Sequence, residues 1–313
     1  MTNPNVIITG AHGFIGRHTS RVFEREGWRV VGVDQTPWRQ GTPADWGIAQ
    51  WHVGEVTTEV LTSLNICPAA VVHCAGSGSV GFSYVEPAKD FRYNVETTIN
   101  ALEFIRLYAP NAVLIIPSSA AVYGLAGKLP TPTNHPTNPV SPYGVHKLIT
   151  EMLCRSYQRN FGLTAVIIRF FSVFGEGQRK LLLWDACRKI SSGQSEFFGS
   201  GNETRDFLHV EDAAALIQLA AIQAPRGEIN VINGGTGQSA TVRAIIEELV
   251  KLLTCELIPV FNGQTRTGDP PHYLADISEP LRWGWSPSVK LQDGLRRYVE
   301  WWQRVNGSRT SVR

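Results

Sequence analysis

Short runs of consecutive apolar residues alternate with longer amphipathic stretches along the first half of the chain. The first run, residues 6–8, precedes a stretch of helical periodicity at about 14–25, and a second run follows at 29–34. Runs that are apolar at nearly every position are typical of strands buried on both faces, and helices between such strands indicate right-handed βαβ crossovers. The pattern therefore predicts an α/β fold built on a doubly wound parallel sheet. Further strands are expected at residues 70–73, 113–116 and 165–168.

Two long helices are expected in the middle of the chain, over about residues 87–108 and 143–160. The segment between them, residues 129–142, is rich in Pro, Thr and Asn, which is typical of a loop. No internal repeat or low-complexity tract interrupts this organisation.

The regular alternation weakens after residue 175. We expect residues 1–175 to form a first domain, in which later segments at about 205–235 are interleaved, and residues 176–313 to form mainly a smaller lobe. The elements expected beyond residue 175 are short apolar segments at 197–199 and 229–231, a helix at 241–253, an amphipathic helix at about 291–305 and a frayed tail at 306–313.

The composition is that of an ordinary globular protein, since 43% of the 313 residues are hydrophobic and 18% are charged. The formal net charge of +2 argues against nucleic acid as a dominant partner. The five scattered cysteines include no Cys-x-x-Cys pair and suit a reducing compartment better than a disulfide or metal framework. No apolar run approaches the roughly 20 residues that span a membrane, and the N-terminus lacks a signal-peptide pattern. We therefore predict a cytoplasmic protein with no membrane partner and no metal.

A glycine pattern follows the first predicted strand, with Gly10, Gly13 and Gly16 spaced as Gly-x-x-Gly-x-x-Gly. Glycines are needed where a backbone turns tightly, approaches phosphate closely and packs a helix against a strand. The N-terminus of the following helix offers free N–H groups and partial positive charge to a pyrophosphate. An ordinary strand-to-helix turn is the alternative. The strand before, the helix after and an acidic residue at the end of the next strand favour nucleotide binding.

That acidic residue, Asp34, can accept hydrogen bonds from ribose hydroxyls, and its charge repels a 2′-phosphate. It therefore favours NAD as the cofactor and makes NADP the less favoured choice, although Arg39 lies nearby. Glu55 has two equally weighted interpretations: it meets the adenine edge, or it simply starts a helix over residues 56–64.

Tyr143 and Lys147 are four residues apart on a predicted helix, so they share one face. A nearby ammonium and a nicotinamide cation are expected to lower the pKa of the phenol, which can then act as an acid or base during hydride transfer. Ser119 ends a predicted strand, where doubly wound sheets carry ligand-binding loops, and its hydroxyl can meet the same substrate oxygen. A solvated helix face and a turn serine are the plainer alternatives.

These motifs resemble those of the extended short-chain dehydrogenase/reductases. The resemblance covers nearly the whole chain in the right order and is greatest for the NAD-dependent nucleotide-sugar epimerase/dehydratase branch, which includes UDP-glucose 4-epimerases. The segments that carry it are 9–16, 94–98, 118–124, 143–147, 169–175 and 205–212.

The resemblance implies a Rossmann-type NAD-binding domain over residues 1–175 and a substrate-binding lobe mainly over 176–313, with roles for individual residues. Catalytic positions fall on Ser119, Tyr143 and Lys147. Cofactor positions fall on Gly10, Gly13, Phe14, Ile15, Asp34, Glu55, Ala75, Gly76, Asn94, Tyr143 and Lys147. Substrate positions fall on Ser77, Ser119, Ser172, Arg205 and Arg266, and the two arginines suit a nucleotide diphosphate.

Four departures from the family pattern narrow the reaction. Ala120 and Ala121 stand where the 4,6-dehydratases carry an Asp-Glu pair, so water elimination is disfavoured. Ser172 occupies a position that is commonly Asn in the epimerases, and Gly78 one where well-studied epimerases have Lys. Both positions are expected near the substrate diphosphate or sugar, which argues against a plain UDP-galactose assignment.

The leading hypothesis is an NAD-dependent nucleotide-diphosphate-sugar 4-epimerase that works through a transient 4-keto sugar. The alternative is a 4-ketoreductase of a nucleotide-diphosphate 4-keto-6-deoxysugar, and a non-catalytic nucleotide sensor is a weaker third. Asp34 favours the epimerase, whereas Ser172 and Gly78 favour the reductase. The resemblance also implies a homodimer, in which the two long helices form a four-helix bundle with their copies.

Overall fold

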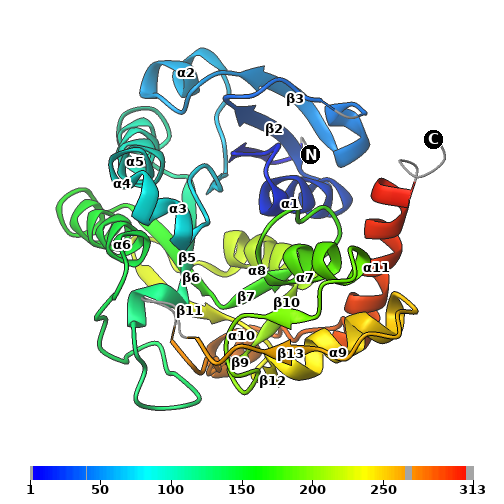
Figure 1. The fold of residues 1–313 in the computed structure, drawn as a ribbon. Helices are drawn as coiled ribbons and strands as arrows, with labels where there is room; N and C mark the ends of the chain where they lie inside the picture. The colour runs from blue at the N-terminus through cyan, green and yellow to red at the C-terminus, as the bar shows by residue number, and fades with distance from the viewer. Residues whose placement is uncertain (1–2, 40, 265–269, 308–313) are drawn as a thin grey trace.

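Seven parallel strands form the central sheet of this computed structural model, which describes residues 3–39, 41–264 and 270–307 (Figure 1). Their order across the sheet is β11-β6-β5-β4-β1-β2-β3, so the direction of winding reverses between β1 and β4. Ligands of doubly wound sheets bind at the carboxyl ends of the strands at such a point. The strands are β1 Asn5–Thr9, β2 Arg29–Asp34, β3 Ile48–Val53, β4 Ala70–His73, β5 Val113–Ser119, β6 Thr164–Phe170 and β11 Ile229–Gly234.

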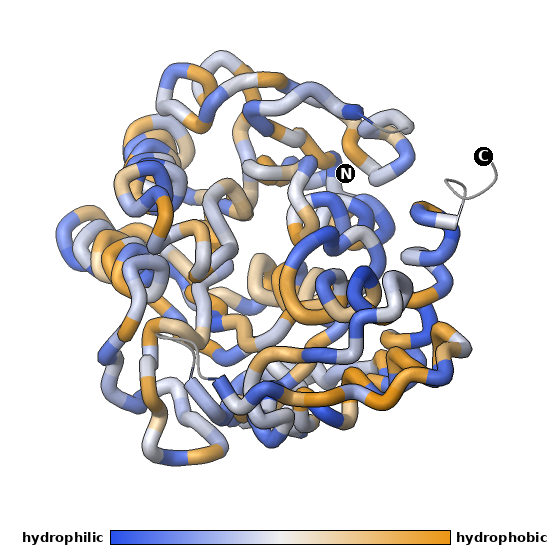
Figure 2. Tube along the Cα trace, viewed as in Figure 1, coloured by the Kyte–Doolittle hydropathy of each residue, from blue (hydrophilic) through white to orange (hydrophobic). Residues whose placement is uncertain are grey.

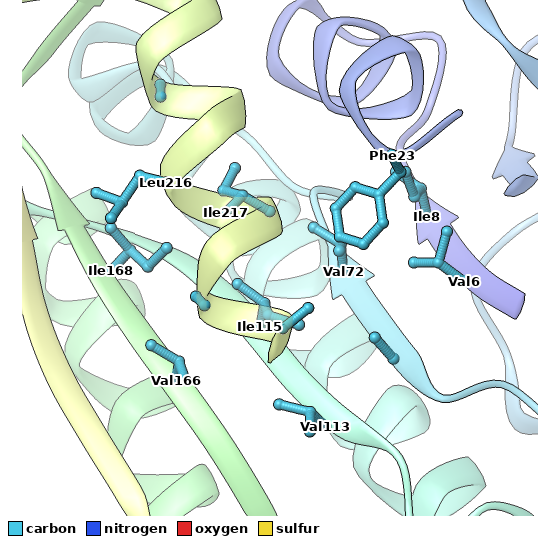
Figure 3. Packing of buried hydrophobic residues seen from close by; sticks show 14 of the residues in the cluster. Val6, Ile8, Phe23, Val72, Val113, Ile115, Val166, Ile168, Leu216 and Ile217 are labelled. Carbon is cyan, nitrogen blue, oxygen red and sulfur yellow. The ribbon is translucent and has the colours of Figure 1, made fainter. Parts of the chain in front are cut away.

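Helices cover both faces of the sheet, because neighbouring residues of each strand point to opposite faces. On one face Phe23 of α1 (Phe14–Arg25) and Ile217 of α8 (Val210–Gln223) pack over Ile8 and Val72 (Figure 3). On the other face Ile7 lies in a second core. The helices that carry residues of this second core are α2 Thr58–Ser63, α5 Thr97–Tyr108 and α6 Pro142–Phe161. In Figure 2 these helices carry hydrophobic and hydrophilic segments in alternation, as expected for helices with one face on a core.

A third core lies within the smaller lobe, where α7, α9 and α11 pack together. The bounds of these helices are Leu181–Ser191, Val242–Leu252 and Leu291–Gly307. Three two-stranded sheets lie apart from the central sheet: β7 Ser172–Phe174 with β10 Phe207–His209, β9 Thr204–Arg205 with β12 Ala240–Thr241, and β8 Glu196–Phe197 with β13 Val260–Phe261. Short helical segments complete the fold: η1 Pro43–Trp46, α3 Val80–Val85, η3 Ala120–Tyr123 and α10 Ser278–Arg282.

The expected strands at residues 6–8, 29–34, 70–73, 113–116 and 165–168 are confirmed, as is the helix at 14–25. The expected long helix over residues 87–108 is confirmed, with one irregularity that was not predicted. The structure has α4 (Pro87–Phe91), a π-helical turn at Arg92–Glu96 and then α5. A π-helical turn inserts an extra residue, and such insertions often lie at functional sites.

Three further differences concern boundaries. β3 was not predicted, whereas the apolar segment expected at 229–231 lies in the central sheet as part of β11, within the interleaved segments expected at about 205–235. α2 begins at Thr58 and is capped by Thr57, so Glu55 does not start it. The final helix reaches Gly307, and the rest of the expected tail lies outside the described residues. In the described part of the chain, no helix is long and apolar enough to cross a membrane.

Candidate active site

The predicted site residues gather at the carboxyl ends of the strands that flank the reversal of winding. Gly10 follows β1, Ala75 and Gly76 follow the adjacent β4, and Ser119 ends β5. Because these strands are parallel neighbours, the three loops lie along one edge of the sheet. The fold alone therefore brings the glycine turn and the serine to the same side of the molecule (Figure 1).

The glycine turn is built so tightly that side chains would not fit. Gly10 has φ +63°, and a Cβ there would lie 2.6 Å from the amide nitrogen of Ala75. A Cβ on Gly16 would lie 2.2 Å from the carbonyl oxygen of Gly10. Gly13 caps α1 without any side chain in the way, so the first N–H groups of the helix stay open, and Phe14 and Ile15 follow it half-buried. This cradle fits a dinucleotide pyrophosphate.

Asp34 connects the end of β2 to the glycine turn. Its Oδ2 accepts a hydrogen bond from the backbone N–H of His12 at 3.2 Å, and its Oδ1 accepts from the amide and hydroxyl of Thr36 at 3.0 and 2.8 Å. A carboxylate has about four acceptor sites, so capacity remains for a ribose hydroxyl. The rings of Trp38 and Trp51 pack around His12, with the Trp38 centroid at 4.8 Å. Glu55 is exposed in the loop between β3 and α2.

Asn94 lies in the π-helical turn and faces the loop that follows β4. Its Nδ2 donates to the backbone carbonyl of Asp90 at 3.0 Å, and its buried Oδ1 has no hydrogen-bond partner among the described residues. A Cβ on Gly76 would lie 2.7 Å from that oxygen, so only glycine fits beside Asn94. An unpartnered acceptor beside the loop suits a cofactor that brings a donor there. Ala75 and Ser77 flank Gly76 and are half-buried.

The helix α6 carries Tyr143 to Ser119. Ser141 caps α6 by accepting from the amide of Gly144 at 3.1 Å, and Pro142 occupies the first turn. A Cβ on Gly144 would lie 2.7 Å from the carbonyl oxygen of Ala121, so the glycine allows the helix to approach η3 closely. As a result the Tyr143 phenol lies close enough to the Ser119 hydroxyl to influence its ionisation.

Lys147 lies one turn further along α6. Its Nζ donates to the carbonyl oxygen of Pro117 in β5 at 3.0 Å and lies 5.9 Å from the centroid of the Tyr143 ring. The contact anchors the lysine to the strand that ends in Ser119. The structure therefore brings Ser119, Tyr143 and Lys147 together.

The lowered tyrosine pKa was expected from Lys147 together with a nicotinamide cation, so it stays a prediction for the NAD-bound protein. Burial raises the pKa of Tyr143 to about 12; the neighbouring Ser119 hydroxyl opposes this rise, and the charge of Asp90 adds to it. Burial also lowers the pKa of Lys147 to about 8. Loss of hydration is the largest cause of both shifts, because both groups lie in the interior. A phenolate at Tyr143 therefore needs additional positive charge.

A buried ion pair supports the serine loop from behind. Arg169 donates from Nε and Nη2 to the two carboxylate oxygens of Glu151 at 3.0 and 2.6 Å, and Ser118 donates to the same carboxylate at 2.7 Å. Arg169 and Glu151 are 3% and 0% exposed. This cluster joins β5, α6 and β6 directly beneath Ser119. The role of Glu151 was not predicted, since nothing local in the sequence distinguishes it from a surface glutamate.

The predicted substrate residues are less tightly gathered. Ser172 begins β7 and donates its backbone N–H to Asp206 at 3.0 Å, next to Arg205 in β9. Arg205 donates to the carbonyl oxygens of Thr204 and Pro271 at 2.9 and 3.1 Å. Arg266 lies outside the described residues.

Lys180 is a residue that the sequence did not indicate. A Cβ on Gly78 would lie 3.6 Å from the Lys180 Nζ, so an ammonium from the loop before α7 lies beside the position where the resemblance implies a lysine. Although the residue is exposed overall, loss of hydration around its ammonium lowers the pKa of Lys180. The next residue, Leu181, has φ +68°, a strained conformation for a leucine. Only the folded chain brings Gly78 and Lys180 together.

A glycine turn at the point where the winding reverses, an acidic residue ending β2 and a Ser-Tyr-Lys set together define a nicotinamide-dependent enzyme of the doubly wound class. A family model described as the NAD dependent epimerase/dehydratase family matches residues 6–233. The chain belongs to this family.

Known proteins similar to this chain include several 4-epimerases. The UDP-glucose 4-epimerase of Azospirillum brasilense is 31% identical over 96% of this chain and 92% of its own length. The structure of UDP-N-acetylglucosamine 4-epimerase from Methanobrevibacter ruminantium M1, in complex with UDP-N-acetylmuramic acid, is similar with a TM-score of 0.88, 26% identity and coverage of 97% of this chain and all of that one. A UDP-glucuronic acid 4-epimerase variant from Bacillus cereus, in complex with NAD and UDP-4-deoxy-4-fluoro-glucuronic acid, has a TM-score of 0.85, 26% identity and coverage of 96% and 99%.

Proposed function

We propose that this chain is an NAD-dependent nucleotide-diphosphate-sugar 4-epimerase that works through a transient 4-keto sugar. The observation that carries the proposal is the placement of Tyr143 beside Ser119, with Lys147 anchored to β5 next to them, at the strand edge that also holds the glycine turn. Similarity to 4-epimerases over nearly the whole chain supports the reaction class. The similar proteins differ in their named sugars, so the sugar and the base are left open.

The residues of the glycine turn and its neighbours would hold NAD. Gly10 and Gly13 leave room for the pyrophosphate, Asp34 accepts from a ribose hydroxyl, and Asn94 offers its unpartnered oxygen near the nicotinamide side. The carboxylate of Asp34 also repels a 2′-phosphate and therefore disfavours NADP. The remaining residues assigned to the cofactor are Phe14, Ile15, Glu55, Ala75, Gly76, Tyr143 and Lys147.

When bound, NAD would supply the acceptor for a hydride from C4 of the sugar and the donor for its return to the opposite face. Tyr143 takes the proton of the C4 hydroxyl, keeps it while the 4-keto sugar turns over, and returns it to the re-formed hydroxyl. Ser119 holds the same oxygen by a hydrogen bond. Lys147 holds a positive charge near the phenol, which favours its ionised form. Since the phenol is buried, the proton is shielded from bulk water between the two transfers.

The substrate diphosphate and sugar would be held by residues of the smaller lobe and the β4 loop. We assign these roles to Ser77, Ser119, Ser172, Arg205, Arg266 and, in addition, Lys180. An ammonium beside Gly78 provides the cation that this position lacks. A 4,6-dehydratase reaction is disfavoured, because Ala120 and Ala121 offer no acid or base at the end of β5.

The nucleotide that co-purifies with the protein tests the proposal. We expect retained NAD, interconversion of UDP-sugars that differ at C4, and no requirement for added NAD(P)H. Tyr143→Phe should abolish turnover and keep the bound NAD, whereas the exposed Tyr108→Phe should change neither. Protein that purifies without nucleotide and consumes NADPH on a 4-keto-6-deoxysugar nucleotide would instead identify the 4-ketoreductase.

A homodimer through α5 and α6 is part of the same proposal. Both helices present apolar side chains to the surface, among them Leu107, Met152 and Phe161, which are each at least half exposed. Sedimentation should give twice the chain mass, and Met152→Glu should shift the protein toward the monomer.

We also assign the protein to the cytoplasm, in keeping with the free thiols of its cysteines. Residues 1–175 with 205–235 are assigned to the NAD domain and 176–313 mainly to the substrate lobe.

A further inference from the structure

A short segment in the connection from β7 to α7, residues 176–180, contacts the helix that follows the glycine turn. We call it the bridging segment. The carbonyl oxygen of Gly177 accepts from Nη2 of Arg17 at 2.8 Å, and the carbonyl oxygen of Glu176 lies 3.0 Å from Nε2 of His18. Both partners belong to α1, whose first turn forms part of the cradle for the dinucleotide. The backbone of the bridging segment is therefore tied to the cofactor helix.

The far end of the bridging segment reaches the loop that follows β4. The Lys180 Nζ lies 3.6 Å from the point where a Cβ on Gly78 would stand. The same loop contains Ala75, whose amide nitrogen would lie 2.6 Å from a Cβ on Gly10 in the glycine turn. The bridging segment therefore extends from α1 to the β4 loop, the two parts of the chain that frame the cradle.

The approach of the bridging segment to α1 is too close for a side chain at residue 177. Gly177 has φ +93°, and a Cβ there would lie 2.1 Å from Nη2 of Arg17. A glycine is thus required both by the backbone conformation and by the position of the guanidinium. The contact with α1 is consequently part of the folded structure and not a chance approach of a surface loop.

The side chain of Glu176 ties the bridging segment to two helices at once. Its Oε1 accepts from Nε of Arg297, in α11, at 2.8 Å, and its Oε2 lies 2.9 Å from Nε2 of His209, which caps α8. Since Nδ1 of His209 accepts from the amide of Glu211 at 3.3 Å, Nε2 carries the hydrogen and donates to Glu176. Arg297 also donates to both carboxylate oxygens of Glu211, at 3.0 and 2.7 Å, which fixes the guanidinium in place.

Gln178 provides a second tie between the bridging segment and α11. Its carbonyl oxygen accepts from the hydroxyl of Tyr298 at 2.8 Å, and its Nε2 donates to the carbonyl oxygen of Val173 at 2.9 Å. Gln178 and Tyr298 are 4% and 0% exposed. The helix α11 carries none of the cofactor or substrate residues assigned above, yet it fixes a segment that contacts the cofactor helix.

We propose that Glu176 and Arg297 are positioning residues that hold the bridging segment across the cradle and thereby keep NAD bound between turnovers. This role rests on the proposed function, because an epimerase reoxidises the cofactor that it has reduced, whereas a reductase exchanges its cofactor in every turnover. Loss of the ties leaves the glycine turn and Asp34 intact but frees the bridging segment to move. The main effect is therefore on the rate at which NAD leaves.

The release of NAD from the purified, NAD-loaded protein tests this role. The protein is diluted into alcohol dehydrogenase and ethanol, which convert each released NAD into NADH and report it by absorbance. Glu176→Ala removes both side-chain ties, and we expect release about tenfold faster than in the wild type, the factor that the loss of one charge-assisted hydrogen bond gives. Arg297→Ala should act in the same direction. Glu176→Gln keeps one acceptor oxygen and should have a smaller effect.

Two controls separate positioning from a general loss of stability. Arg296→Ala removes the neighbouring arginine of α11, whose ion pair with Asp293 is exposed, and should leave the release of NAD unchanged. Leu249→Ala opens a cavity in the third core. It should lower the melting temperature but leave the release of NAD unchanged at temperatures where the protein is fully folded.

Faster release in Glu176→Ala and Arg297→Ala supports the proposal, provided that added NAD restores the activity that these variants lose on dilution. Release at the wild-type rate in both variants overturns it, and so does an equal acceleration in Leu249→Ala. If Glu176→Ala does not fold, Glu176→Gln and Arg297→Ala decide between these outcomes. If no UDP-sugar is epimerised, the proposed function fails, whereas the release rates need no turnover and still test the bridging segment.

Discussion

His73, the last residue of β4, is buried as a neutral imidazole, and we predict that it makes the protein sensitive to acid. The residue is 4% exposed, with Nδ1 at 2.9 Å from the Thr9 hydroxyl and Nε2 at 3.2 Å from the Thr97 hydroxyl. The Thr97 hydroxyl donates to the carbonyl of Tyr93 at 2.6 Å, so it accepts from an Nε2–H. Thr9 accepts from the amide of Ala75 and donates to Nδ1. One neutral tautomer therefore satisfies the whole chain of hydrogen bonds.

Protonation of His73 is opposed in the folded state. Burial lowers the pKa of His73 to about 3, and the charge of Lys147 lowers it further. In the unfolded chain a histidine has a pKa of about 6.5. Below that pH the unfolded state binds a proton that the folded state does not, so stability falls as the pH decreases from about 6.5 toward 3. Each pH unit costs about 1.4 kcal/mol, which gives about 2 kcal/mol at pH 5.

Urea unfolding at pH 7 and pH 5, followed by tryptophan fluorescence, measures this loss. His73→Gln keeps a donor toward Thr97 and cannot be protonated, so the difference between the two pH values should be about 2 kcal/mol smaller than in the wild type. His18, whose pKa burial lowers to about 4, and the carboxylates titrate alike in both proteins and cancel. His272→Gln, on the surface, should retain the wild-type difference. An identical pH difference in wild type and His73→Gln would refute the argument.

Three further substitutions test other parts of the site. Gly16→Ala places a methyl group 2.2 Å from a carbonyl oxygen of the glycine turn, so the purified protein should carry no NAD, while Gly127→Ala, with open space around it, should carry the normal amount. Glu151→Gln leaves the buried Arg169 without its anion and should lower the free energy of unfolding by about 3–5 kcal/mol in a denaturant titration. Lys180→Ala should raise KM for the nucleotide sugar about tenfold with little change in kcat. The diphosphate that the ammonium would bind has the same charge in the bound substrate and in the transition state, so the lysine would stabilise both equally.

The strand pattern of the first half was predictable because buried parallel strands are apolar at nearly every position. β3 escaped prediction because Gln50 and His52 interrupt its apolar pattern, as expected for a strand at the edge of a sheet. The π-helical turn at residues 92–96 also escaped, since one inserted residue hardly alters a helical periodicity. Both features depend on how the chain packs rather than on its local sequence.

The candidate site was predictable where it depends on spacing and unpredictable where it depends on burial. Tyr143 and Lys147 share a helix face by spacing alone, and Ser119 reaches them because strand ends of a parallel sheet meet at one edge. The raised pKa of Tyr143 in the protein without NAD could not be predicted, because the sequence shows which charges are near but not how much water both groups lose. The contact between the Asp90 carboxylate and the His146 imidazole joins residues that are 56 positions apart, so no local sequence pattern predicts it.

The missing lysine at position 78 shows how a departure in sequence can be offset in space. Taken alone, Gly78 argued against a plain UDP-galactose assignment and favoured the reductase. In the folded chain the Lys180 ammonium lies 3.6 Å from the point where a side chain at residue 78 would begin, so the same region holds a cation. A glycine at 78 is also what leaves room for that ammonium. Gly78 and Lys180 therefore form one complementary pair, and the absence of lysine at 78 no longer weighs against the 4-epimerase.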